Sequence, residues 1–251
     1  MISRSLALGA MIPVLASGFY LAATPARADL VLETETAQIG KKGQGNISNA
    51  FQVEKDADGK TYLTESQFEY GVNDRTEILI EPFFYEKQMP NGGPSTSGVG
   101  DLEVTLSYMV MTETANRPAI LLAEKVKIPT ATNRDIGTGK ADFQSYVIVG
   151  KTIGGVEFNL NLGYEFVGKT DTADLKSQVI YDISADFPVG ERTTLFAEAF
   201  GNTSPEYGVT STNAVSVGAE YQISQHVNAF VAVGDDTDDR KVGRIGFNYG
   251  W

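Results

Sequence analysis

Strict alternation of apolar and polar residues over segments of about ten residues most limits the folds open to this chain. In the clearest segment, 156–166, every second residue is Val, Phe, Leu or Tyr, and the residues between are Glu, Asn or Gly. A period of two is typical of a β-strand with one apolar and one polar face. About ten residues is also the length that a tilted strand needs to cross the hydrocarbon layer of a membrane.

The same alternation recurs to the end of the chain and predicts twelve strands. We expect them at residues 47–55, 62–72, 76–85, 102–110, 118–127, 143–153, 156–166, 178–187, 194–201, 213–221, 227–234 and 241–251. Nothing after the N-terminal region offers a transmembrane helix. Because only helices and closed barrels satisfy their own backbone hydrogen bonds in lipid, a membrane location requires these strands to close into a barrel.

The connections between the segments alternate between two length classes. The tight connections are 73–75, 112–117, 154–155, 188–192 and 222–225. The others are 56–59, 86–98, 129–140, 168–177, 202–212 and 235–240, of which only the first and last are short. Short turns at one rim and longer loops at the other are typical of outer-membrane barrels, whereas a Greek-key sandwich has no reason to sort its loops in this way. The predicted fold is all-β: an antiparallel up-and-down transmembrane β-barrel of about 12 strands over residues 47–251.

Residues 1–28 have the features of a signal peptide. A basic residue and an apolar stretch over 6–21 precede an A-x-A cleavage site that ends at Ala28. A retained helical anchor fits less well, because Pro13 interrupts the apolar stretch, which falls short of the ~20 residues needed to span a bilayer. We therefore expect export, cleavage near Ala28 and residence in the cell outer membrane, with residues 29–46 as an N-terminal periplasmic or plug segment.

The last predicted strand carries the most specific signal. Ile245, Phe247, Tyr249 and Trp251 share one face, and the chain stops at the aromatic residue. A lipid-facing apolar row that ends in an aromatic ring places that ring at the membrane interface, where amphipathic rings prefer to lie. The arrangement resembles the C-terminal recognition strand of outer-membrane proteins. It implies that these four residues are an assembly signal, with the barrel-assembly machinery and outer-membrane lipids as partners.

Composition excludes several function classes. The chain has no Cys, which removes disulfides, thiol catalysis and thiolate metal sites. Its net charge of −12 becomes −14 once the two Arg residues of the predicted signal peptide are removed. An acidic protein of this kind disfavours nucleic acid as a partner, because every phosphate contact would oppose the field of the whole protein. We expect no cofactor.

Three motifs that could carry chemistry have simpler explanations. His226, the only histidine, lies beside a short predicted turn and is expected to be a turn residue rather than a catalytic base. The Gly-Thr-Gly-Lys sequence at 137–140 lacks the full phosphate-loop spacing and precedes a strand, so no helix N-terminus is available to a phosphate. Four Asp residues within 235–239 lack the ligand spacing of a calcium motif and are expected to be solvated. We predict no catalytic residue and no metal site.

The polar faces of the strands bear on function, because they line the lumen of a barrel. They carry eleven acidic and three basic residues: Glu65, Glu69, Glu77, Glu81, Glu103, Lys125, Lys127, Glu157, Glu165, Asp182, Asp186, Glu198, Glu220 and Arg244. Part of this charge must be ion-paired, because unpaired buried carboxylates are costly. The surplus predicts a negative interior that favours cations or neutral polar solutes over anions. Twelve strands leave a narrow passage unless residues 29–45 fold in as a plug.

Four short motifs lie at the ends of predicted strands: YGVNDRTE at 70–77, SGVGDL at 97–102, KIPT at 127–130 and GTGKADF at 137–143. Together they resemble the family of outer-membrane barrels labelled "putative meta-pathway of phenol degradation". The resemblance covers most of the chain from about residue 60. It implies a transporter-like, porin-like barrel, linked in some members to the catabolism of aromatic compounds, and it implies no catalytic residues.

Three hypotheses on function follow. The first is a channel or uptake barrel for small solutes, aromatic compounds among them by the family resemblance, with the solute itself unknown. The second is a non-conducting structural or surface-binding barrel whose outer loops recognise a partner, favoured if the N-terminal segment occludes the lumen. The third is an outer-membrane hydrolase, which would have to use His226.

Overall fold

The structure is a computed structural model that describes residues 34–170, 174–204, 206 and 209–251. The predicted signal peptide, residues 1–28, lies outside the described residues. The described part forms strands at Gly45–Lys55 (β1), Gly59–Asn73 (β2), Thr76–Pro90 (β3), Thr96–Gly98 (β4), Leu102–Met111 (β5), Ala119–Ile128 (β6), Asp142–Ile153 (β7), Val156–Phe166 (β8), Gln178–Val189 (β9), Thr193–Asn202 (β10), Thr212–Gln222 (β11), Val227–Asp236 (β12) and Lys241–Gly250 (β13).

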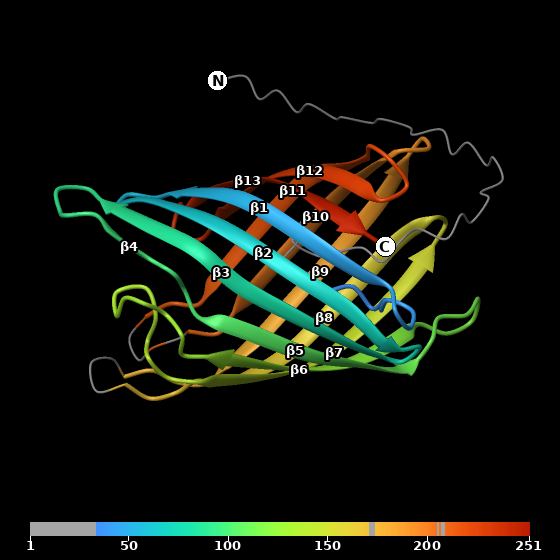
Figure 1. The fold of residues 1–251 in the computed structure, drawn as a ribbon, viewed down its shortest axis with the longest axis horizontal. Coiled ribbons are helices and arrows are strands. Elements are labelled where there is room, and N and C mark those ends of the chain that lie inside the picture. Colours follow the sequence, from blue (N-terminus) through green and yellow to red (C-terminus); the bar gives the residue numbers. More distant parts are fainter. Residues whose placement is uncertain (1–33, 171–173, 205, 207–208) are drawn as a thin grey trace, which may run out of the picture.

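Twelve of these strands pair antiparallel in chain order and close into a barrel (Figure 1). Closure is made by β1 and β13, which are in register from Asn46 opposite Gly250 to Lys55 opposite Lys241. The short strand β4 pairs only with β3, so it is an addition to the wall rather than part of it. The predicted up-and-down barrel of twelve strands is confirmed.

The connections separate the barrel into two rims. The short-turn rim carries the turns β2–β3, β5–β6, β7–β8, β9–β10 and β11–β12, and the long-loop rim carries the remaining connections. Both ends of the barrel sequence lie at the short-turn rim, where the Gly45 and Trp251 backbones exchange hydrogen bonds of 3.3 and 3.0 Å. An even number of wall strands requires the two ends to meet at one rim.

The largest departure from the predicted strand bounds is at β2 and β3, which are each fifteen residues long. Residues 86–90 have no clear alternation and were predicted as loop. They are a strand because they continue the ladder with β2 and pair with β4. The ladder between β3 and β5 ends earlier, at Pro82 opposite Leu102, which is consistent with proline having no N–H to donate.

Apolar side chains cover most of the outside of the wall, and most of the buried inward side chains are polar. Leu162, Ile183 and Ile245 are 58, 53 and 60 % exposed, whereas the inward Asn161 and Ser184 are each 1 % exposed. A water-soluble sandwich buries its apolar face, so this inverted pattern is the one that lipid requires. No helix within the described ranges is long and apolar enough to cross a membrane.

Candidate functional site: the barrel interior

The described part of the N-terminal segment, residues 34–44, crosses the lumen. Its backbone donates hydrogen bonds to side chains on three strands: Thr34 N to Glu198 Oε2 on β10 (3.1 Å), Ala37 N to Asn159 Oδ1 on β8 (3.0 Å) and Gly40 N to Glu77 Oε2 on β3 (2.6 Å). In the closed ring of twelve strands, β3 and β10 are six strands apart and therefore lie on opposite walls. The segment then leads into β1 at the short-turn rim. There Gly43 N donates a hydrogen bond to Gly71 O of the neighbouring strand β2.

The middle of this segment packs against an apolar cluster inside the barrel. Ala37 is 3 % exposed and packs in a cluster with inward residues of β5, β6 and β7, namely Met109, Ala119, Leu121, Ala123 and Ile148. Sequence reasoning missed these residues because it assigned polar side chains to the lumen. The sequence did contain a signal for this cluster, because residues 119–123 are apolar on both faces of the strand. A strand with water on one side would alternate between apolar and polar residues.

A second apolar cluster narrows the lumen on the β10–β1 side. Phe196 and Phe230 point inward, are 2 and 3 % exposed, and pack with Ala50 and Ala232. Each ring lies over a glycine of a neighbouring strand, since a Cβ on Gly218 would collide with Phe196 and one on Gly246 with Phe230. The interior is thus partly filled by its own side chains, despite the width of a twelve-stranded wall.

None of the fourteen predicted lumen residues is exposed, and all are buried or half-buried. Among them, Lys125 lies at the centre of an ion-pair cluster. Its Nζ is 2.8 Å from Glu81 Oε2 and 3.2 Å from Glu103 Oε2. Because β3, β5 and β6 supply one member each, this cluster ties three strands together from the inside.

Three of the other predicted lumen acids, Glu157, Glu165 and Glu220, accept hydrogen bonds from side-chain amides. Glu157 accepts from Gln38 and Asn159, Glu165 from Gln144 and Gln178, and Glu220 from Asn248, while Glu69, Asp182 and Asp186 are 5, 7 and 2 % exposed. The third predicted base, Arg244, lies 3.6 Å from Glu65 and donates to Gln52. Amide partners satisfy carboxylate oxygens without cancelling their charge, so the charge of these residues stays predominantly negative.

Three of the four sequence motifs meet at Lys127, near the long-loop rim. Its ammonium pairs with Asp142 and lies 3.9 Å from Asp101. These two carboxylates also hold loop backbone, as Asp101 accepts from Ala131 N and Asp142 from Gly168 N. The motifs therefore anchor loops at the long-loop rim of the barrel.

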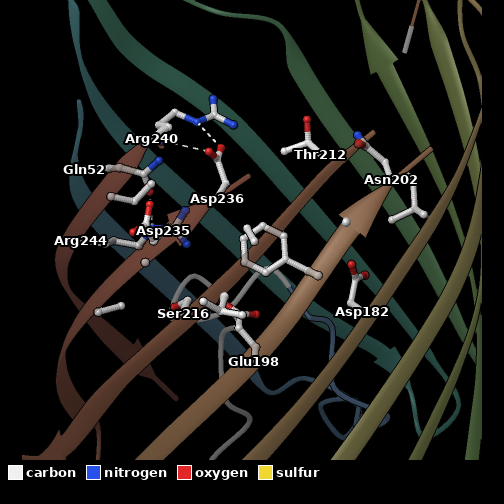
Figure 2. Close-up of a pocket in the computed structure, with 18 of the residues that line it drawn as sticks. Gln52, Asp182, Glu198, Asn202, Thr212, Ser216, Asp235, Asp236, Arg240 and Arg244 are labelled. Carbon is white, nitrogen blue, oxygen red and sulfur yellow. Dashed lines mark hydrogen bonds and ion pairs between the residues drawn. The ribbon is translucent and has the colours of Figure 1, made fainter. Parts of the chain in front are cut away.

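A cavity of about 470 Å³ lies between the N-terminal segment and the long-loop rim (Figure 2). Residues that belong to its lining include Glu35 from the segment, Lys125 and Tyr146 from one wall, and Glu198 and Ser216 from the other. At the mouth, Arg240 pairs with Asp236 at 2.9 Å and lies 3.5 Å from Glu54. The arrangement can bind a small molecule and contains no obvious catalytic constellation.

The remaining motif residues have structural partners. His226 Nδ1 is 2.8 Å from Gly250 O, and its ring lies against Tyr249, so it braces the last strand at the short-turn rim. In the 235–239 loop, Asp235 pairs with Lys241. No group of three or more potential metal-ligating side chains occurs among the residues that the structure describes.

Comparisons with known proteins agree with this architecture. The sequence profile of the family described as "Putative MetA-pathway of phenol degradation" matches residues 36–249. An outer membrane channel from Pseudomonas putida F1 has a similar structure, with a TM-score of 0.68, 13% sequence identity, and coverage of 93% of this chain and 100% of that one. The NanC porin (TM-score 0.60, 8% identity, 81% and 98% coverage) and the KdgM porin (0.57, 12%, 80% and 98%) share the fold. No curated protein sequence matches the chain.

Proposed function

The chain belongs to the family described as "Putative MetA-pathway of phenol degradation", and from that membership and the fold we propose that it is an outer-membrane channel or uptake barrel for small solutes. The observation that carries this proposal is the combination of an apolar outer wall with a charged interior that contains a cavity of about 470 Å³. A purely structural barrel has no need of such an interior. Aromatic compounds enter as candidate solutes through the family description.

The orientation and maturation of the barrel belong to the same proposal. The short-turn rim faces the periplasm and the long-loop rim faces outward, as is usual for barrels with short periplasmic turns. Residues 1–28 are removed near Ala28 as a signal peptide. The outward row Ile245, Phe247, Tyr249 and Trp251 serves the assembly machinery.

Selectivity follows from the charge of the wall. Eleven acidic and three basic residues make up the predicted lumen set, and each base contacts at least one acid. The net negative interior favours cations and neutral polar solutes over anions. Residues 34–44 narrow the route, so passage is limited to small species.

Planar-bilayer recording of the mature protein tests this function. We expect discrete conductance steps, and in a KCl gradient a reversal potential of the sign that K⁺ preference gives. A folded barrel that never conducts would remove the channel proposal, and a preference for Cl⁻ would remove the role of the lumen acids.

The second candidate is a non-conducting barrel with a structural or surface-binding role. It is favoured by the apolar clusters and by the N-terminal segment, which together fill much of the interior. The same recording separates the two, because only this candidate predicts folded protein that never opens.

A further inference from the structure

One side of the cavity is apolar, which is unexpected for the inward face of a polar lumen. We define the apolar patch as Ile180, Phe200, Ala214, Ala232 and Val242, one residue from each of the strands β9 to β13. The residues alternate with exposed outward neighbours along their strands, so they face the interior. Phe200 lies directly opposite Ala214 in the ladder of β10 and β11, which makes its ring part of a continuous surface.

Two carboxylates border this apolar patch. Asp182 is the cross-strand partner of Phe200 on β9, and Glu198 precedes Phe200 by two residues on the same face of β10. Their exposed fractions are 7 and 6 %. Figure 2 shows both among the side chains that line the cavity. A molecule lying on the patch would therefore have an acidic group within reach.

The cavity as a whole carries excess negative charge. Asp235 pairs with Lys241 at the rim, and without it seven acidic and three basic residues belong to the lining. Each of the three bases already contacts at least one carboxylate among the residues that the structure describes. A cation is thus favoured in this space, and an anion is disfavoured, whatever the detailed pairing of the acids.

We propose that this cavity binds a small organic cation: an ammonium group attached to an aromatic or short aliphatic body. The ammonium lies beside Asp182 and Glu198, where charge-assisted hydrogen bonds form, and the body covers the apolar patch, where it is removed from water. The cavity volume lies within the range that binds small ligands. This inference rests on the proposed function and names the solute class that the outer half of the barrel selects.

Calorimetric titration of the refolded mature barrel in detergent, with a detergent-only blank, tests the proposal. The probes are phenethylammonium, the neutral 2-phenylethanol, the anionic phenylacetate and ethylammonium, which lacks the ring. We expect phenethylammonium to bind about tenfold or more tightly than each of the others, since one charge-assisted contact or one buried ring is worth at least that factor. Equal affinity for the amine and the alcohol, or tighter binding of phenylacetate, would overturn it.

Matched variants locate the site. Asp182→Asn should weaken phenethylammonium binding about tenfold and leave 2-phenylethanol unchanged. Asp186→Asn is the control, because Asp186 lies on the same strand and the same face, is 2 % exposed, and is not part of the cavity lining. Phe200→Thr should weaken phenethylammonium and not ethylammonium. Heat-modifiable gel mobility establishes folding, and equal effects of Asp182→Asn and Asp186→Asn would refute the assignment.

Ion conductance separates this inference from the proposed function. A barrel that conducts K⁺ but does not distinguish the amine from the alcohol overturns the cation site and leaves the channel in place. A barrel that binds the amine through Asp182 but never conducts supports the site and overturns transport.

Discussion

At the scale of single residues, the packing of the terminal Trp251 ring depends on a position without a side chain. A Cβ on Gly45 would collide with the indole ring of Trp251, which also lies 6.0 Å from the ring of Phe68. Gly45→Ala should therefore displace the terminal ring; because that ring is the far end of a side chain that is 41 % exposed, the cost should lie at the low end for overpacking, about 1 kcal/mol. Loss of the heat-resistant folded band on a gel at a lower temperature measures the effect.

Gly243→Ala is the matched control, because a Cβ at Gly243 on β13 meets nothing within 4 Å. If both variants melted together, the cost would come from glycine replacement in general and not from Trp251.

One outward-facing position of the wall carries a charged side chain instead of an apolar one. Glu124 on β6 is exposed on the outward face, between Leu122 and Val126, and accepts a 2.6 Å hydrogen bond from Ser145. A carboxylate facing lipid is unfavourable, so Glu124→Leu should stabilise the barrel by about 1–2 kcal/mol. Urea unfolding from lipid vesicles measures this, with Leu122→Glu expected to shift stability in the opposite direction.

At the scale of elements, a clasp joins the β5–β6 turn to the end of β7 at the short-turn rim. Glu113, in the β5–β6 connection, accepts hydrogen bonds from Lys151 Nζ at 2.8 Å and from the N and Oγ1 of Thr152 at 2.8 and 3.1 Å. Partial burial acts to raise the pKa of Glu113, but the hydrogen bonds from Lys151 and Thr152 outweigh it and hold the pKa below the usual 4.5. The clasp is therefore strongest when Glu113 is ionised.

This lowered pKa sets a pH dependence. Because the folded pKa lies below the unfolded one, the stabilisation is fully present above pH 4.5 and is lost as the pH falls through the folded value. Glu113→Gln should cost no more than about 1 kcal/mol at neutral pH, since the group is solvent-exposed, and should cost nothing in strong acid. Melting curves across pH check this, with Glu191→Gln on the β9–β10 turn as control; a difference that grew in acid would contradict the clasp.

The strands differ in how accurately their bounds could be predicted from the sequence. Lipid imposes one requirement on every outward position, so alternation located the wall strands, and the bounds of Val156–Phe166 were predicted to the residue. The end of β3 was missed because residues 86–90 pair only with β2 and β4, where the membrane no longer selects apolar side chains. Inward positions such as Phe196 and Leu121 follow no period, since each is determined by the groups that it packs against inside the barrel.

At the scale of the whole molecule, a segment with no periodicity of its own lies across the lumen of the barrel. Residues 34–44 are held by wall groups distant in sequence, from Glu77 to Glu198, and these contacts depend on the closed barrel. The charge of the lumen set could be listed from the sequence, but the division of the lumen into an outer cavity and an obstructed inner part could not.

A matched pair of substitutions tests whether this segment controls conductance. Ala37 is buried against Leu121 and Ile148, whereas its neighbour Gln38 is exposed within the lumen. Ala37→Asp places a carboxylate in the apolar cluster, where an unpaired charge is strongly destabilising. The segment should therefore dissociate from the cluster, and single-channel conductance should rise several-fold. Gln38→Asp adds the same charge and costs the segment its hydrogen bond to Glu157, but it leaves the apolar cluster intact, so conductance should change much less than in Ala37→Asp. Equal conductance of the two variants would mean that added charge, and not release of the segment, sets the current, and that residues 34–44 do not act as a plug.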